Sequence, residues 1–167
     1  MADRKEAITG QRREKLNKIR SRNIDPYPHR YPRTHTIQAA IAIFQQQEGN
    51  DATSPQISVA GRIMSQRSMG KATFLDIRDS TGKIQVYLRR DTLGEAKYQY
   101  LRDFDIGDFM GVSGKIFRTK SGEITVDASD FAMLSKSLLP LPEKWHGLTD
   151  IEKRYRQRYL DLISNEE

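Results

Sequence analysis

Residues 74–88, FLDIRDSTGKIQVYL, decide the fold class of this chain. Apolar side chains alternate with other residues on both sides of a polar segment, Asp79-Ser80-Thr81-Gly82, that has the composition of a tight turn. A spacing of two places successive side chains on opposite faces of a β-strand. The stretch therefore predicts a β-hairpin with strands over 74–77 and 84–88 and one buried face.

Further strands flank this hairpin. Residues 57–63 alternate in the same way, 93–104 have a helical pattern, and strands at 109–117 and 123–128 enclose the turn Lys120-Ser121-Gly122. The order is three strands, a helix and two strands. That order is typical of a five-stranded OB-fold barrel, which binds oligonucleotides on one face of its strands.

Helices are predicted on both sides of the barrel. Residues 3–22 are good helix formers without proline, and 37–47 form a second helix that Thr36 can cap. After the barrel, 138–142 is a linker with two prolines and 150–163 is an amphipathic helix. We expect an all-β core with added helices, divided into a basic helical extension (1–50), an OB-fold domain (51–137) and a linker with a helix (138–167).

Composition narrows the possible functions. No apolar run approaches the roughly 20 residues of a membrane helix, so no membrane partner is expected. Cysteine is absent and the amino terminus lacks the apolar stretch of a secretory signal, which favours the cytoplasm. His29, His35 and His146 have no acidic or thiol cluster at ligand spacing, and no nucleotide-binding or catalytic motif occurs. We therefore predict no metal, no catalytic residue and no cofactor within this chain.

The charge is distributed unevenly. The whole surplus of +6 lies in residues 1–33, which contain ten basic and four acidic residues, whereas the rest of the chain is balanced. A basic arm on a neutral body is typical of proteins that bind a polyanion, although a solvated helix can have the same composition. We predict that five cations of the first helix contact nucleic-acid phosphates, namely Arg12, Arg13, Lys15, Lys18 and Arg20.

Strand alternation also assigns residues to the outside of the barrel. Phe74 and Gln85 fall on the outer face, and Glu123 lies there at the start of the last strand. An exposed ring can stack on a base, which is worth about 1–3 kcal/mol. An amide and a carboxylate together match uracil, whose edge has one N–H donor between two carbonyl acceptors, whereas cytosine lacks that donor. The same three residues could instead cap an open barrel end or be ordinary solvated strand residues.

Several segments resemble the anticodon-binding domain of bacterial-type class II lysyl-tRNA synthetases. They are 25–28 (DPYP), 59–64 (VAGRIM), 67–74 (RSMGKATF), 83–87 (KIQVY), 120–123 (KSGE) and 146–163, with RYRQRYLDLI at its end. The resemblance extends from about residue 12 to the end of the chain. It implies that Phe74 stacks on the middle anticodon base of tRNA(Lys), a uracil, and that Gln85, Glu123 and Arg67 hydrogen-bond it. Alternation alone would turn Arg67 inward unless a β-bulge intervenes.

The resemblance further implies a lysine–tRNA ligase that uses ATP and Mg²⁺ and forms a homodimer through a catalytic domain absent from this chain. The chain alone should bind the anticodon stem-loop and be inactive as an enzyme. Aspartyl and asparaginyl synthetases share the barrel and also read a middle uracil, and only the ending RYRQRYLDLI favours the lysyl version. Two alternatives stay open: a free-standing OB-fold protein that binds single strands with little sequence preference, and a domain that docks protein partners.

Overall fold

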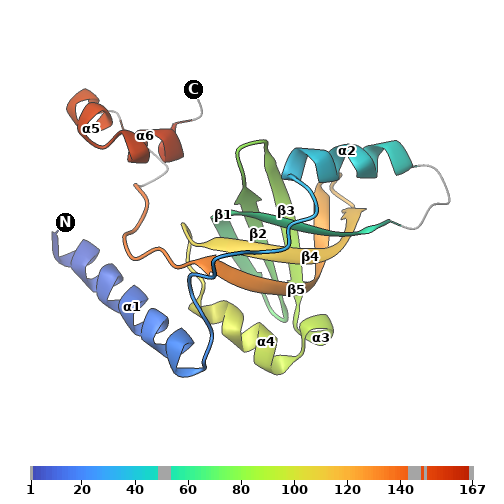
Figure 1. Ribbon diagram of the computed structural model, residues 1–167, viewed down its shortest axis with the longest axis horizontal. Coiled ribbons are helices and arrows are strands. Elements are labelled where there is room, and N and C mark those ends of the chain that lie inside the picture. The colour runs from blue at the N-terminus through green and yellow to red at the C-terminus, as the bar shows by residue number, and fades with distance from the viewer. Residues whose placement is uncertain (1, 49–53, 143–147, 149, 166–167) are drawn as a thin grey trace.

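Five strands form a closed barrel in the order β1-β2-β3-β5-β4 (Figure 1). The computed structural model describes residues 2–48, 54–142, 148 and 150–165. β3 and β5 pair in parallel and all other neighbours are antiparallel. The OB-fold prediction, an all-β core with added helices, is confirmed. The strands are β1 (Gln56–Met69), β2 (Ala72–Arg78), β3 (Lys83–Arg89), β4 (Phe109–Arg118) and β5 (Ile124–Ser135).

The barrel interior is filled by the side chains that alternation assigns to it. Burying each such aliphatic side chain stabilises the fold by about 1.5–3 kcal/mol. The core side chains of β2 and β3 are all at most 2% exposed: Leu75, Ile77, Ile84, Val86 and Leu88. Their neighbours along the same strands therefore face outward, where they are free to meet a ligand.

The turn between β2 and β3 is tied to the second helix by Asp79. The Asp79 carboxylate accepts hydrogen bonds from the backbone N–H of Thr81 at 2.7 Å and of Ile37 at 2.9 Å. Burial opposes its ionisation, but these bonds outweigh burial and lower the pKa of Asp79. The helix α2 (Ile37–Gln47) has the predicted bounds, and the Thr36 hydroxyl caps it by accepting a backbone N–H at 3.3 Å.

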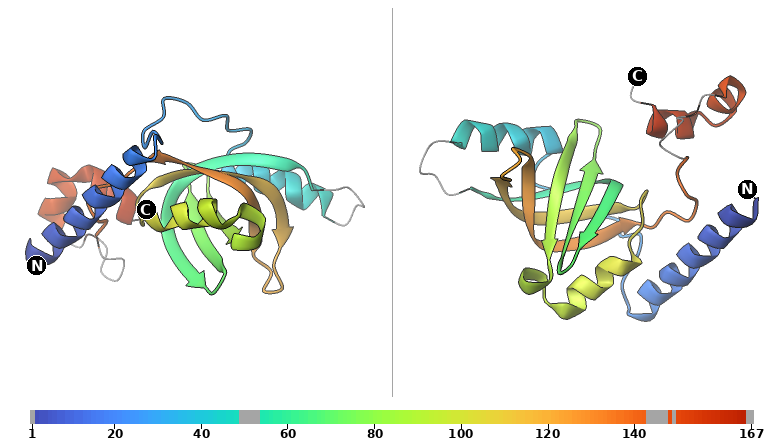
Figure 2. Two further views of the ribbon diagram at one scale, coloured as in Figure 1. Left: turned by 90° about the horizontal axis from the view of Figure 1, so that it is seen from below. Right: turned by 180° about the vertical axis from the view of Figure 1, so that it is seen from behind.

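The helical segment between β3 and β4 is broken, contrary to the single helix predicted over 93–104. It consists of α3 (Arg90–Leu93), α4 (Glu95–Tyr100) and a 3-10 turn, η1 (Leu101–Asp103). The break falls at Gly94, whose φ of +82° is incompatible with a continuous helix. α2 and α4 lie at opposite ends of the barrel (Figure 2).

The first helix, α1 (Ala2–Ser21), was predicted to be exposed, and this is wrong for one of its faces. Leu16 and Ile19 are 7% and 0% exposed, and the Arg12 side chain is buried with them. The Arg12 guanidinium donates to the carbonyl oxygens of Ile106 (2.9 Å), Leu139 (3.2 Å) and Ser137 (3.3 Å). These bonds hold α1 against the turn that precedes β4 and against the segment that follows β5.

The segment predicted as one helix over 150–163 forms two, α5 (Ile151–Arg156) and α6 (Arg158–Ser164). Gln157 interrupts them with φ −122° and ψ 55°. Both helices lie away from the barrel, beyond the end of β5 (Figure 1). Within the described parts of the chain, no helix has the length and apolarity to cross a bilayer. The division of the chain at residues 50 and 137 stays a prediction.

Candidate nucleic-acid interface

Outward side chains form two rows that run across β1, β2, β3 and β5. The first row contains Arg67, Phe74, Tyr87 and Asp127, which are successive register partners. The second row contains Ser65, Asp76, Gln85 and Thr125, again as register partners. Side chains opposite one another on neighbouring strands lie about 5 Å apart at Cβ, so each row is a continuous surface. Two predicted base-reading residues, Phe74 and Gln85, thus lie in adjacent rows of one face.

A β-bulge brings Arg67 to this face. The register between β1 and β2 shifts between Ile63 and Ser65, so Met64 is the extra residue. Ile63 is fully buried, whereas Arg67 is exposed and pairs with Phe74. The bulge reverses the alternation that would have turned Arg67 inward.

Three aromatic side chains, Phe74, Tyr87 and Phe117, form what we call the aromatic platform. The rings of Phe74 and Tyr87 are stacked, with centroids 4.6 Å apart and an interplanar angle of 22°. The ring of Phe117, from β4, lies 6.3 Å from Tyr87 at 57°. All three are half-buried, so each retains surface for contact with a base. Tyr87 and Phe117 were not predicted as stacking residues, although the alternation of β3 already placed Tyr87 on the outer face.

Gln85 is held in a defined orientation. Its Oε1 accepts a hydrogen bond from the Thr125 hydroxyl at 2.9 Å, and Thr125 is fully buried although it points away from the barrel core. This bond fixes which end of the amide faces Thr125, and the amide nitrogen is the group that can donate to a ligand. Gln85 itself is 8% exposed, so a carbonyl that reaches it would be largely shielded from water.

Glu123 lies in the turn just before β5, two residues ahead of Thr125. Its backbone N–H donates to the Thr119 hydroxyl at 3.0 Å, and its carbonyl accepts the Thr119 N–H at 2.9 Å. These bonds and the φ of +91° at Gly122 define the turn. The exposed Glu123 carboxylate is thus carried by an ordered backbone two residues before Thr125, the last member of the row that contains Gln85.

A polar pair beside the platform was missed by sequence reasoning. Arg89 donates to Asp127 Oδ2 at 2.8 Å, and its guanidinium carbon lies 5.6 Å from the Tyr87 ring centre. Arg89 Nε and Asp127 Oδ1 are buried and have no hydrogen-bond partner among the described residues. An unsatisfied donor and an unsatisfied acceptor side by side are complementary to a polar ligand edge. The only sequence signal was that both residues fall on outward positions of their strands.

The five cations predicted to contact phosphates differ in what they can do. Arg13 and Arg20 are exposed, and Lys18 is exposed with its Nζ 3.7 Å from Asp103. Lys15 donates to Asp105 at 2.7 Å, and the buried Arg12 binds three backbone carbonyls. A phosphate contact by Arg12 or Lys15 would have to displace bonds within the chain. All five contacts stay predictions.

Among the described residues, no three His, Cys, Asp or Glu side chains lie together in an arrangement that could hold a metal ion. His29 and His35 lie on the segment between α1 and α2, and the Thr34 hydroxyl is 2.8 Å from Nδ1 of His35. His146 lies outside the described residues.

Comparison with known families identifies the barrel. The model of the tRNA anti-codon family, described as an OB-fold nucleic acid binding domain, matches residues 57–134. This stretch is an OB-fold nucleic acid binding domain. It contains the aromatic platform and every predicted base-reading residue, whereas the five predicted phosphate-contacting cations of α1 precede the matched stretch.

The OB-fold domain and its flanking helices together match lysine–tRNA ligases. The chain is 52% identical to the lysine–tRNA ligase of Dehalococcoides mccartyi strain CBDB1 over 161 residues, 96% of this chain and 32% of that protein. It is 53% identical to the Pelotomaculum thermopropionicum enzyme and 46% identical to that of Bacillus subtilis strain 168, over 93% and 92% of this chain. The chain spans about a third of the length of these relatives. The resemblance inferred from the sequence motifs is confirmed.

Proposed function

We propose that this chain recognises the anticodon stem-loop of tRNA(Lys) within a class II lysine–tRNA ligase. The proposal is supported chiefly by the aromatic platform and its polar neighbours on one face of an OB-fold domain whose relatives are lysine–tRNA ligases. Stacking on aromatic rings combined with hydrogen bonds to base edges is how proteins read splayed single-stranded bases.

The proposed reading of the middle uracil uses residues from both outward rows. Phe74 stacks on the base, and the Gln85 amide nitrogen, oriented by Thr125, donates to a carbonyl. The Glu123 carboxylate accepts the ring N–H, and Arg67 supplies a second donor. Cytosine has no ring N–H to give, so a carboxylate facing it would lose its partner. The carboxylate would instead face the lone pair of the cytosine ring nitrogen, so uracil is preferred.

The phosphate backbone of the stem-loop is assigned to the exposed cations of α1. Arg13, Lys18 and Arg20 supply charge that neutralises phosphates and releases counterions. Arg12 and Lys15 instead fasten α1 to the barrel, so they position the other cations. Arg12 and Lys15 contact phosphates as well only if RNA replaces the hydrogen bonds that they make within the chain.

The ligase chemistry is proposed for the part of the relatives that this chain does not span. ATP and Mg²⁺ would act in that part of the protein, which would also form the homodimer. The whole enzyme would lie in the cytoplasm. The chain by itself is expected to bind RNA and to form no aminoacyl-adenylate.

Titration of a labelled anticodon stem-loop tests the proposal. Replacing the middle uracil with cytosine should weaken binding by about 10-fold or more. Phe74→Ala should weaken it by about 1–3 kcal/mol while the fold is retained. Tyr155→Ala is the matched control, because Tyr155 is an 81% exposed aromatic residue on α5, outside the platform. Equal affinity for both stem-loops would favour a generic single-strand binder, and no RNA binding at all would favour a domain that docks proteins.

A further inference from the structure

The outer face of the barrel continues past the aromatic platform toward the tip of the β1–β2 hairpin. A third row of register partners lies there, with Met69 on β1, Ala72 on β2 and Arg89 on β3. Each lies two residues along its strand from a member of the row that contains Phe74, so all three side chains point to the same face. These three residues, which we call the tip row, therefore adjoin the surface proposed to read the middle uracil.

Within the tip row, Ala72 places only a methyl group between two long side chains. Opposite residues on neighbouring strands have Cβ atoms about 5 Å apart, so those of Met69 and Arg89 are separated by about 10 Å across Ala72. Met69 is 67% exposed, and the Arg89 side chain is 42% exposed. A planar base can therefore lie over the methyl group, with one face toward the thioether and the other toward the guanidinium.

The Arg89 guanidinium is held in place without any ligand. It donates to Asp127 Oδ2 at 2.8 Å, and its central carbon lies 5.6 Å from the Tyr87 ring centre. It thus adds a further planar group beside the stacked rings of Phe74 and Tyr87. Aromatic rings and arginine guanidinium planes are the groups on which proteins stack splayed bases. Because this plane is already oriented, little side-chain entropy is lost when a base binds.

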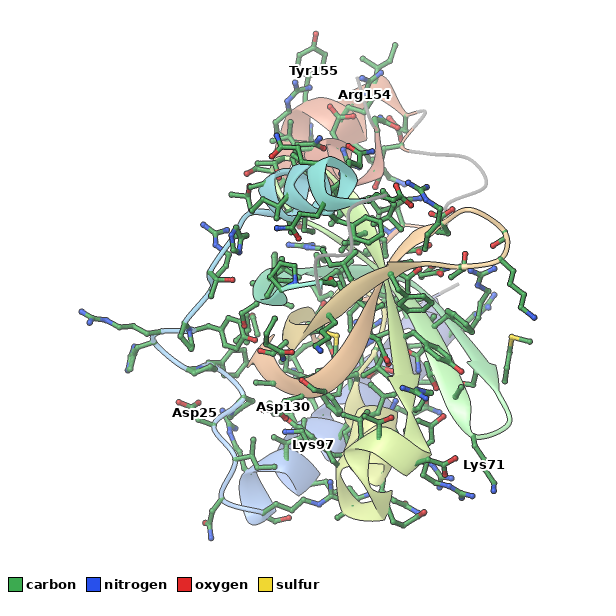
Figure 3. The ribbon with its side chains drawn as sticks, turned by 90° about the vertical axis from the view of Figure 1, so that its right-hand side faces the viewer. Asp25, Lys71, Lys97, Asp130, Arg154 and Tyr155 are labelled. Atoms are coloured by element: carbon green, nitrogen blue, oxygen red, sulfur yellow. The ribbon has the colours of Figure 1, made fainter. Side chains whose placement is uncertain are left out.

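The strand ends that carry the tip row are joined to each other. The Arg90 N–H donates to the Lys71 carbonyl at 2.9 Å, which ties the hairpin tip to the end of β3. Lys71 lies at that tip, and its exposed side chain extends away from the barrel (Figure 3). A base seated on the tip row would therefore have a cation nearby for its phosphate.

The chemistry of the tip row favours stacking over the reading of base edges. A thioether is polarizable and contacts aromatic rings without a strict direction, which is why methionine is common on surfaces that accept several partners. Stacking on a guanidinium uses the π-face that every base has. The tip row is therefore suited to contribute affinity with little preference among the four bases.

We propose that the tip row holds a base that flanks the middle uracil of the anticodon, between the Met69 thioether and the Arg89 guanidinium. This inference rests on the proposed function, because it takes the middle base to be stacked on Phe74. It adds a base site that tolerates any sequence to the selective site formed by the two neighbouring rows. Holding the flanking base there keeps the anticodon loop splayed while the middle base is read.

Titration of labelled anticodon stem-loops, intact or with one base removed, tests the inference. Met69→Ala and Arg89→Lys both preserve the net charge, so they remove the thioether or the planar group without changing the overall attraction to RNA. Each should weaken binding of the intact stem-loop about 3- to 5-fold. Removing the base at one flanking position should weaken binding to the parent chain about 10-fold and abolish the effect of both variants. Exchanging that base for any other should change the affinity less than about 3-fold.

Two substitutions on α5 serve as matched controls. Ile151 is 67% exposed, the same fraction as Met69, and Arg156 is an exposed arginine. Both lie away from the barrel (Figure 1). Ile151→Ala and Arg156→Lys should leave the affinity for every stem-loop as it is in the parent chain.

Unchanged affinity in Met69→Ala and Arg89→Lys would overturn the inference, as would losses that persist when either flanking base is removed. The proposed function has a separate test in the same titrations, because Phe74→Ala should lose its effect only when the middle base is removed. If that coupling is present, failure at the tip row leaves the proposed function standing. If it is absent, or if no stem-loop binds, the proposed function itself is contradicted and the tip-row inference fails with it.

Discussion

Replacing Lys136 with methionine should destabilise the fold by about 3 kcal/mol at neutral pH. The Lys136 side chain is fully buried after β5, with Nζ 2.7 Å from both Asp105 and Asp108. Methionine retains most of the apolar stem but removes the ammonium. The Asp108 side chain is also fully buried and would be left without a cation.

The expected loss of stability depends on the hydrogen-bond partners that the carboxylates of Asp105 and Asp108 retain. Removing one member of a buried ion pair typically costs about 3–5 kcal/mol. Asp105 retains Lys15 at 2.7 Å, and Asp108 retains the backbone N–H groups of Asp105 and Ser137, both at 2.8 Å. These partners place the expected loss at the lower end of the range. It corresponds to a decrease in Tm of roughly 6–12 °C for a chain of this size.

The loss should depend on pH. Burial raises the pKa of Asp108 even beside Lys136, and without the ammonium it should rise further. A carboxyl whose folded pKa lies above the unfolded value destabilises the fold as pH rises between the two values. The deficit of Lys136→Met relative to the parent should therefore shrink as pH falls from 7 to about 4.5.

Urea unfolding at both pH values measures this deficit. Lys97→Met is the matched control, because it removes an exposed ion pair of similar length and should cost less than about 1 kcal/mol. Adding Asp108→Asn to Lys136→Met should recover part of the loss, since the fully buried charge is removed although one of the two backbone N–H groups then faces the amide NH₂. A deficit that is equal in both lysine variants, or that does not change with pH, would refute the reasoning.

The remaining predictions concern RNA binding. Tyr87→Ala should lower stem-loop affinity by about 1–3 kcal/mol in fluorescence anisotropy even with Phe74 intact, and unchanged affinity would remove Tyr87 from the platform's role. Glu123→Gln should weaken the preference for uracil over cytosine in the same assay, and full discrimination would show that the carboxylate does not read the base. Arg13→Ala with Arg20→Ala should reduce the slope of log affinity against log salt by about 1.5, and an unchanged slope would exclude both from phosphate contact.

The β-sheet was predictable because alternation is a local property of the chain. Leu75, Val86 and their neighbours fix which face of each strand is buried, and this also placed Phe74, Gln85 and Tyr87 on the outside. The limits of α2 were equally predictable, since Thr36 supplies a cap whose geometry depends on its immediate neighbours.

Features that depend on contacts distant in sequence were not predictable. The bulge at Met64 arises from the pairing of β1 with β2, and no residue type in β1 predicts it. Arg12 appears in the sequence as one of many cations on a basic helix. Only the fold brings it to carbonyl groups more than 90 residues away. Arg89 and Asp127 likewise meet only because β3 and β5 pair in parallel.

The extra residue in β1 means that a change in chain length could alter recognition without any substitution. Deleting Met64 would remove the bulge but keep Arg67 opposite Phe74 on the outer face, because Ser65 would then follow Ile63 in strict alternation. One residue added between Ile63 and Arg67 with the bulge retained would instead send the Arg67 guanidinium toward the apolar interior. An insertion beside the bulge therefore exchanges the two chemically different faces of the strand that follows it, whereas loss of the extra residue does not. A comparison of barrels of this kind should count residues between the buried Ile63 and the hairpin tip before it aligns side chains.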